Sequence, residues 1–112
     1  MNDVAHISIT STDSEAVITG SGILDLTNTS EFRELLENAA AARQEVAVDL
    51  RAAVFIDSAV LQYLGSAGRK MLRDGRRLKV MVVENSHPHY VLTTVGFASL
   101  MTIEVEPTSE NG

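Results

Sequence analysis

The feature that most constrains this fold is a long amphipathic helical pattern enclosed by two short apolar runs. Over residues 60–72 the apolar side chains recur at the spacing of one helix face, and Gly75 follows where a left-handed cap is expected. EVAVDL (45–50) precedes this pattern and LKVMVV (78–83) follows it. A strand–helix–strand order of this kind is typical of parallel sheets.

The amino-terminal part adds a hairpin and a further helix. Residues 4–10 alternate apolar and polar side chains, and STDS separates them from a second apolar run, AVITG. Two glycines in residues 20–22 predict a bulge or bend. The following helix is expected to begin at Asn28, Thr29 or Ser30, with Glu31 near the positive end of the helix dipole.

The carboxy-terminal part predicts a short helix and a last edge strand. Ser86 is the expected helix N-cap, with Pro88 in the first turn and Gly96 as the stop. TIEVE then ends the ordered chain. The sequence thus predicts an α/β domain with a mixed, largely parallel four- to five-stranded sheet and helices packed mainly on one face. One domain over residues 1–105 and a tail over 106–112 are expected.

Composition narrows the classes of protein. The chain has 112 residues, 45% of them hydrophobic, with no cysteine and a net charge of −6. These values predict a folded cytoplasmic domain, argue against nucleic acid as a direct partner and exclude thiolate metal sites. No opening signal-peptide pattern and no membrane span are expected. The basic stretch at 69–79 is interpreted as a solvated helix flank, with a docking patch for an acidic partner as the alternative.

Catalytic, metal and cofactor motifs are weak. The residues around Ser58 are IDSAV, which is not the G-x-S-x-G elbow of a serine hydrolase. His87 and His89 flank Pro88 without a third ligand nearby, so we expect exposed residues around a proline cap rather than a metal site. No phosphate-binding loop or dinucleotide fingerprint occurs, and no cofactor is predicted. The GSAG stretch (65–68) is expected to let another backbone approach the helix.

The pair Asp57-Ser58, at the start of the long helix, has two possible roles. Either residue suits an N-cap, and capping alone would explain the pair. Alternatively, Ser58 accepts a phosphoryl group, because a helix amino terminus favours an anion. Phosphorylation would add about 1.5–2 negative charges without melting the helix.

The sequence resembles the STAS domain of bacterial anti-sigma factor antagonists. The resemblance rests on VAVDLRAAVFIDSAVLQYLGSAGRKMLRDGRRLKVMVVE, on VLTTVGFASLMTIEV and on the earlier GILDLTNTSEFRELL, in the family's order. It implies that the domain is not an enzyme and that Ser58 is the regulatory phosphorylation site. The kinase would be an anti-sigma factor with serine kinase activity, using ATP and Mg²⁺, and a PP2C-type phosphatase would reset the switch.

The resemblance also implies a surface that binds the partner. Unphosphorylated, the domain would bind the anti-sigma factor and so release a sigma factor. The residues expected at this surface are Asp25, Asp57, Ser58, Ala59 and Leu61. Val60 stands where the family usually has glycine, so it either obstructs a partner or joins the core. A non-switching scaffold subunit, as in a stressosome or a lipid-transport complex, is the alternative function.

Overall fold

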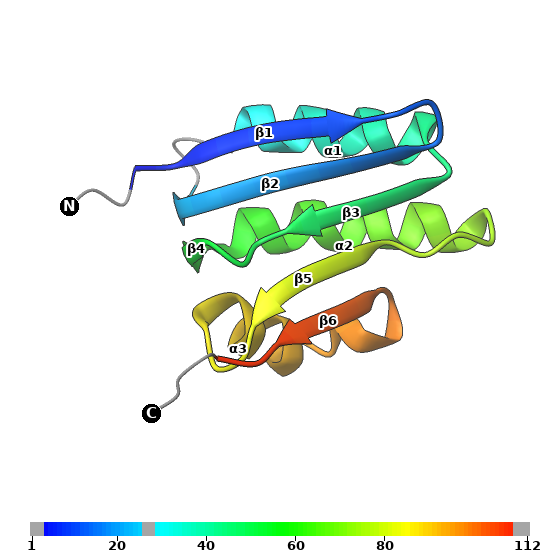
Figure 1. Cartoon of the computed structure of the whole chain (residues 1–112). Helices are drawn as coiled ribbons and strands as arrows, with labels where there is room; N and C mark the ends of the chain where they lie inside the picture. Colours follow the sequence, from blue (N-terminus) through cyan, green and yellow to red (C-terminus); the bar gives the residue numbers. More distant parts are fainter. Residues whose placement is uncertain (1–3, 26–28, 109–112) are drawn as a thin grey trace.

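The computed structural model describes residues 4–25 and 29–108 (Figure 1). Within them the elements are β1 (His6–Ser11), β2 (Glu15–Leu24), α1 (Ser30–Ala42), β3 (Glu45–Asp49), β4 (Ala53–Ile56), α2 (Ser58–Arg73), β5 (Lys79–Val83), α3 (His87–Thr94), the short 3₁₀ helix η1 (Phe97–Ser99) and β6 (Thr102–Glu106). The predicted α/β class is confirmed.

The sheet order explains why the helices gather on one face. The strands follow the order β1-β2-β3-β5-β6, in which only the β1–β2 hairpin is antiparallel. Because each later strand joins the same growing edge, right-handed crossovers place every connecting helix on the same side. Figure 1 shows α1, α2 and α3 behind the sheet, with the other face uncovered. The expectation of helices on one face is therefore confirmed.

A sixth, short strand goes beyond the predicted four or five. The chain turns after β3, and the Ala53 amide donates to the Leu50 carbonyl at 3.1 Å. The chain then continues as β4, which pairs with residues 22–24 at the end of β2. The register shifts between Gly22 and Ile23, and the residue without a partner there is Val54 of β4, so the bulge does not lie in residues 20–22. Within the predicted residues, Gly22 departs from an extended backbone, with φ +79°.

The core lies between the sheet and the helices. Alternate residues of β2 and β5 are buried, as are three consecutive residues of β3 (46–48), and α1 and α2 contribute one apolar stripe each. The largest fully buried side chains are Phe32, Ile18, Leu24, Leu36, Leu50, Ile56, Leu64, Met71, Leu78, Leu92, Met101 and Val48. The helical period predicted the buried stripes of α1 and α2.

The long helix α2 ends as predicted. Gly75 has φ +78°, and the amides of Gly75 and Arg76 donate to the carbonyls of Leu72 and Met71 at 2.9 and 2.8 Å. These two bonds form a Schellman motif, which satisfies carbonyls at the end of the helix. The Arg76 side chain then donates to the carbonyls of Ala40 and Arg43 at the end of α1.

Two glycines of α2 make room for the segment that follows α3. A Cβ atom on Gly68 would lie 3.0 Å from the end of the Met101 side chain and 3.6 Å from the Leu100 carbonyl oxygen. A Cβ atom on Gly65 would lie 3.1 Å from the Phe97 ring. The predicted approach of another backbone is therefore present at Gly68, where it is the Leu100 carbonyl, whereas Gly65 makes room for a side chain.

The remaining boundaries differ little from the predictions. Of the three candidate caps of α1, Thr29 occupies the N-cap position and its carbonyl accepts the Arg33 amide at 2.9 Å, whereas Asn28 lies outside the described residues. Strand β6 runs to Glu106, one residue beyond the domain boundary that we predicted. The predicted tail lies outside the described residues from residue 109 onward, so that assignment stays a prediction.

Candidate functional site

The structure divides the roles of the Asp57-Ser58 pair. Asp57 is the N-cap of α2, and its Oδ1 accepts the amides of Ala59 at 3.0 Å and Val60 at 3.3 Å. Ser58 is the first residue of the helix and is exposed to solvent. Capping therefore falls to the carboxylate, and the serine beside it is exposed.

Tertiary contacts bring Asp25 to the same place. The Asp57 amide donates to the Leu24 carbonyl at 3.1 Å, and Leu24 pairs with Ile56 across the parallel β2–β4 contact. Asp25 follows Leu24 directly and is half-buried. The two aspartates that the sequence places more than thirty residues apart thus lie on neighbouring strand ends, at the carboxyl edge of the sheet.

The other two predicted contact residues are less accessible. Ala59 is only 6% exposed, and Leu61 is half-buried against the core. Any contact that Ala59 makes with a partner would therefore be small, whereas Leu61 keeps part of its side chain at the surface. Val60 is fully buried, so the side chain that replaces the family's glycine belongs to the core and does not obstruct the surface.

An exposed apolar patch beside Ser58 was not predicted. We call Val54, Phe55 and His87 the Phe55 patch. Val54 and Phe55 of β4 are 53% and 40% exposed, and the Phe55 ring stacks on the His87 imidazole with centroids 4.4 Å apart. The signal in the sequence is the run of three apolar residues before Asp57, because a short strand with one covered face cannot bury all three.

The prediction that His87 and His89 are exposed is wrong. Both are half-buried, and the Nδ1 atom of His87 accepts the Ile56 amide at 3.1 Å while that of His89 accepts the Asn85 amide at 2.9 Å. The ring of His87 thus takes the place of a neighbouring strand along β4. Across residues 4–25 and 29–108, no three histidine, cysteine, aspartate or glutamate side chains are grouped to hold a metal ion.

An ion-pair network crosses the same carboxyl edge. Arg51 donates to both carboxylate oxygens of Asp49, at 2.9 and 2.8 Å, and to Glu106 at 2.9 Å. The hydrogen bonds from the Arg51 side chain hold the pKa of Asp49 below its ordinary value, against a smaller opposing effect of burial. The same carboxylates raise the pKa of Arg51. The positive charge of Arg51 is therefore already compensated by two acidic groups.

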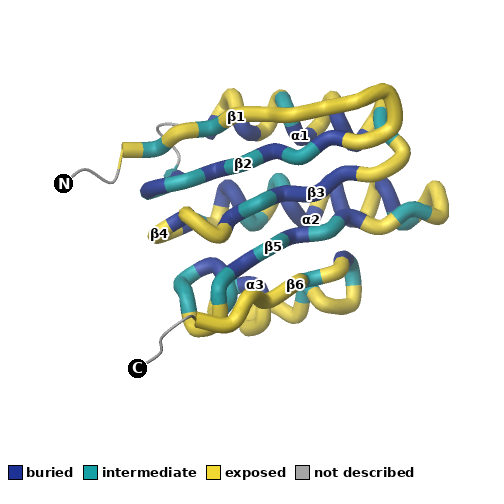
Figure 2. Tube along the Cα trace, viewed as in Figure 1, coloured by how far each residue is buried: buried dark blue, intermediate teal, exposed yellow. Residues whose placement is uncertain are grey.

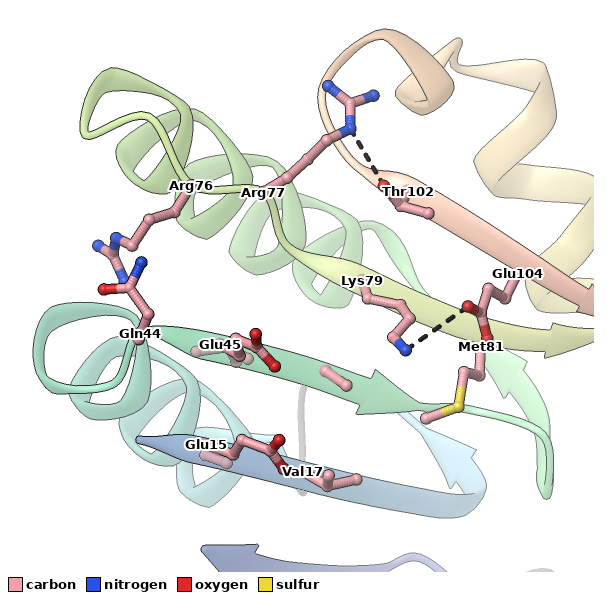
Figure 3. Close-up of a pocket in the computed structure, with 13 residues that line it drawn as sticks. Glu15, Val17, Gln44, Glu45, Arg76, Arg77, Lys79, Met81, Thr102 and Glu104 are labelled. Carbon is pink, nitrogen blue, oxygen red and sulfur yellow. Dashed lines mark hydrogen bonds and ion pairs between the residues drawn. The ribbon is translucent and has the colours of Figure 1, made fainter. Parts of the chain in front are cut away.

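A hollow of about 550 Å³ lies on the open face of the sheet (Figure 3). Its lining includes the first residues of β2, β3, β5 and β6, whereas Ser58 lies beyond the carboxyl end of β4. The hollow is bordered by the amino ends of the parallel strands, whereas ligands of open α/β sheets bind at the carboxyl ends. The basic side chains that line it have partners: Lys79 pairs with Glu104 at 3.5 Å, and Arg77 donates to Thr102 at 3.1 Å. Arg76 donates to main-chain carbonyls at the end of α1. We therefore place the candidate site at Ser58.

The basic stretch at 69–79 is in part structural. Arg76 binds carbonyls at the end of α1, and Arg77 donates to the carbonyls of Ala98 and Met101 at 2.8 and 3.1 Å. These guanidinium groups join separate segments of the fold. The exposed residues Arg69, Lys70 and Arg73 fit the solvated helix flank that we favoured.

Comparisons with known proteins agree with this architecture. The family model described as "Mlab, STAS domain" matches residues 7–102. The chain therefore belongs to the STAS domain family, as the sequence motifs indicated. No curated protein matches the chain.

Three solved structures share the fold, each at 17% sequence identity. An anti-sigma factor antagonist from Mycobacterium paratuberculosis superposes with a TM-score of 0.74, covering 97% of this chain and 91% of that one. The anti-sigma factor antagonist SpoIIAA in its unphosphorylated form gives 0.71, covering 89% and 87%. The Bacillus cell fate determinant SpoIIAA in its phosphorylated form gives 0.61, covering 89% and 90%.

None of the helices in the described part of the chain combines the length and the apolar character that a membrane crossing requires.

Proposed function

We propose that this protein is an anti-sigma factor antagonist that is switched by phosphorylation of Ser58. In its unphosphorylated form it binds an anti-sigma factor with serine kinase activity, and the bound anti-sigma factor releases its sigma factor. The single observation that carries the proposal is the exposed residue Ser58 at the first position of α2, beside a carboxylate that already caps the helix.

The proposed reaction is carried out by the partners. The kinase transfers the γ-phosphoryl group of ATP to the Ser58 Oγ atom, ADP leaves, and the hydroxyl proton goes to a base of the kinase. A PP2C-type phosphatase then hydrolyses the phosphoserine with water and releases inorganic phosphate. This chain supplies the acceptor and catalyses neither step, and all three proteins act in the cytoplasm.

The physical basis of the switch is the cost of burying a dianion. Asp57 holds the amides of Ala59 and Val60, so phosphate on Ser58 would add its charge next to an existing carboxylate. The Phe55 patch beside it favours a partner with an apolar contact surface. Leaving a charge unpaired in such an interface costs about 2–5 kcal/mol, which weakens binding by a factor of roughly tens to thousands.

Phosphorylation of Ser58 is tested by mass spectrometry. The protein is incubated with its candidate kinase, ATP and Mg²⁺, and the modified residue is located. Ser30 provides a matched control, because it is also an exposed serine at the first position of a helix. We expect phosphate on the wild type and on Ser30→Ala but none on Ser58→Ala, and phosphate that persists on Ser58→Ala would refute the assignment.

The binding surface is tested with two further variants. We expect Ser58→Asp to weaken partner binding while the far-ultraviolet circular dichroism stays unchanged. We also expect Phe55→Ala to weaken binding, whereas Val95→Ala, at the C-cap residue of α3, which is 48% exposed, should not. If Phe55→Ala bound the partner as tightly as the wild type, the Phe55 patch would not be part of the interface.

A non-switching scaffold subunit is the second candidate. The matching family model is described as "Mlab, STAS domain" and not as an anti-sigma factor antagonist, which favours keeping this alternative. A scaffold subunit of a stressosome-like or lipid-transport complex would co-purify with its partners equally well with and without ATP. Loss of the complex on addition of ATP and Mg²⁺ would support the switch instead.

A further inference from the structure

The two edges of the sheet are protected very differently. Edge strands present unpaired main-chain groups to other chains, and proteins usually guard them with charged residues or proline. Strand β6 carries Glu104 and Glu106 and is followed by Pro107. The segment VAHISITS (4–11), which contains β1, holds no lysine, arginine, aspartate, glutamate or proline. Figure 2 shows β1 as an almost continuously exposed edge.

The main-chain groups that β1 presents follow from its pairing with β2. The Thr12 amide donates to the Glu15 carbonyl at 2.9 Å, and the register is continuous from Ser11–Ala16 to His6–Ser21. Hydrogen-bonded and non-hydrogen-bonded pairs alternate along an antiparallel ladder. The amides and carbonyls of Ile7, Ile9 and Ser11 therefore point away from β2, toward the open edge.

We propose that β1 is a self-association surface and that its occupant is β1 of a second copy of this chain, paired antiparallel about a two-fold axis at Ile9. In this register Ile9 faces Ile9 of the other copy, and Ile7 faces Ser11. All of the outward main-chain groups of residues 7, 9 and 11 then find partners. Ile9 is 41% exposed although its neighbour Ile18 is fully buried, and the second Ile9 covers it.

The charges favour β1 over β6 as the self-pairing edge. An antiparallel pair of β6 strands centred on Glu104 places the two copies of Glu104 opposite each other, and one centred on Val105 places Glu104 opposite Glu106. Like charges directly opposite each other destabilise a strand pair. The proposed β1 pair meets no such penalty, because residues 6–12 carry no acidic or lysine or arginine side chain.

The dimer leaves the Ser58 site accessible. His6 pairs with Ser21, so the beginning of β1 lies near the carboxyl end of β2, where the Leu24 carbonyl binds Asp57. A two-fold axis across β1 sends the Ser58 sites of the two copies to opposite ends of the joined sheet. The association is therefore independent of the proposed switch, and each copy can bind its own partner.

The expected association is weak. A single pair of six-residue strands is small compared with the contact of a permanent dimer, so we expect a dissociation constant on the order of tens to hundreds of micromolar. Sedimentation velocity of the full chain over a range of concentrations measures it. The wild type should shift from monomer to dimer, and a monomer at all concentrations up to about 1 mM would overturn the proposal.

A charge-swap experiment tests the register. Ser8 and Thr10 are exposed, and in the proposed pair Ser8 of one copy faces Thr10 of the other. The double variant Ser8→Lys/Thr10→Lys should be monomeric, as should Ser8→Glu/Thr10→Glu. An equimolar mixture of the two should form a heterodimer at least as tight as the wild type, because each lysine then faces a glutamate.

Two measurements keep the charge-swap result interpretable. Circular dichroism and the urea unfolding midpoint of each variant should match those of the wild type, since both substituted positions face solvent. Val105→Lys on the opposite edge, β6, at a side chain that is 42% exposed, is the control and should dimerise normally. Loss of dimer in Val105→Lys, undiminished dimer in Ser8→Lys/Thr10→Lys, or no recovery on mixing would each refute pairing through β1.

Discussion

Replacement of Asp57 by alanine tests the division of roles within the Asp57-Ser58 pair. The carboxylate accepts the second and third amides of the 16-residue helix α2 and is itself half-buried. Loss of an N-cap of this kind costs about 0.5–2 kcal/mol, typically about 1. The variant also loses a negative charge at the positive end of the helix dipole, and an interaction of this kind at the surface stabilises a helix by about 0.3–1 kcal/mol. We therefore expect Asp57→Ala to lower the free energy of unfolding by about 1–2 kcal/mol.

The assay is equilibrium urea unfolding followed by circular dichroism, with thermal unfolding as a second measurement. For a chain of this size, 1 kcal/mol corresponds to a decrease in Tm of about 4 °C. Asp57→Asn keeps an acceptor oxygen without the charge, so its loss should lie between those of the wild type and Asp57→Ala. Ser58→Ala should change the free energy of unfolding by less than about 0.5 kcal/mol, as exposed substitutions usually do.

The outcome that would refute this reasoning is a Ser58→Ala variant that is destabilised as much as Asp57→Ala. Such a result would assign the capping to the hydroxyl. A phosphoryl group on Ser58 would then remove the cap, and the switch would have to act by loosening α2. An unchanged unfolding midpoint in Asp57→Ala would show that the two amides find water instead, and that the carboxylate contributes nothing to the helix.

Three further predictions concern Arg76, Asp49 and Gly75. Arg76→Ala should lower the free energy of unfolding by about 1.5–3 kcal/mol in urea titrations, because charged hydrogen bonds to two carbonyls are lost, whereas the exposed Arg73→Ala should have little effect. The pKa of Asp49 is lower in the folded state than its value near 3.8 in the unfolded state. The ionised carboxylate therefore contributes its full stabilisation at pH values above 3.8, and this stabilisation is lost as the pH falls through the folded-state pKa. Carbon-13 NMR titration of Arg51→Ala should show the pKa of Asp49 returning toward 3.8, and an unchanged pKa would contradict the assigned cause. Gly75→Ala should cost about 1–2 kcal/mol, and Gly75→Asn less, since φ is +78° there; equal unfolding midpoints for both would argue against a strained left-handed cap.

Local signals predicted the elements and the family well. The features that were found depend on neighbours in the chain, so the sequence contains the information needed to find them. They are the helical spacing over residues 60–72, the cap at Ser86 and the stop at Gly96. Ser86 does accept the His89 amide at 3.3 Å, and Gly96 has φ +76°. The predicted contact residues around Ser58 other than Asp25 are contiguous with it, and their roles stay predictions.

The features that were missed depend on where the chain folds back. The Phe55 patch arises because β4 pairs with the end of β2 alone and packs on His87, a residue more than thirty positions away. His87 looked like an exposed residue beside a proline, and nothing in its neighbourhood indicates that its ring would accept a strand amide. The sequence likewise indicated only that Arg76 belongs to a basic stretch. It did not indicate that the side chain binds carbonyls at the end of α1.

The sequence by itself determined the order of the helices and of every strand except β4, the buried stripe of each long helix, and the glycines that end α2 and α3, because hydrophobic period and capping chemistry act over a few neighbouring residues. Only the tertiary structure decided that Asp57 caps and Ser58 is exposed, that Val60 lies in the core, and that Asp25 lies beside them. Those outcomes depend on which strand ends meet at the carboxyl edge of the sheet. The pairing of strands that are distant in the chain is set by the packing of the whole core, and no short stretch of sequence contains it.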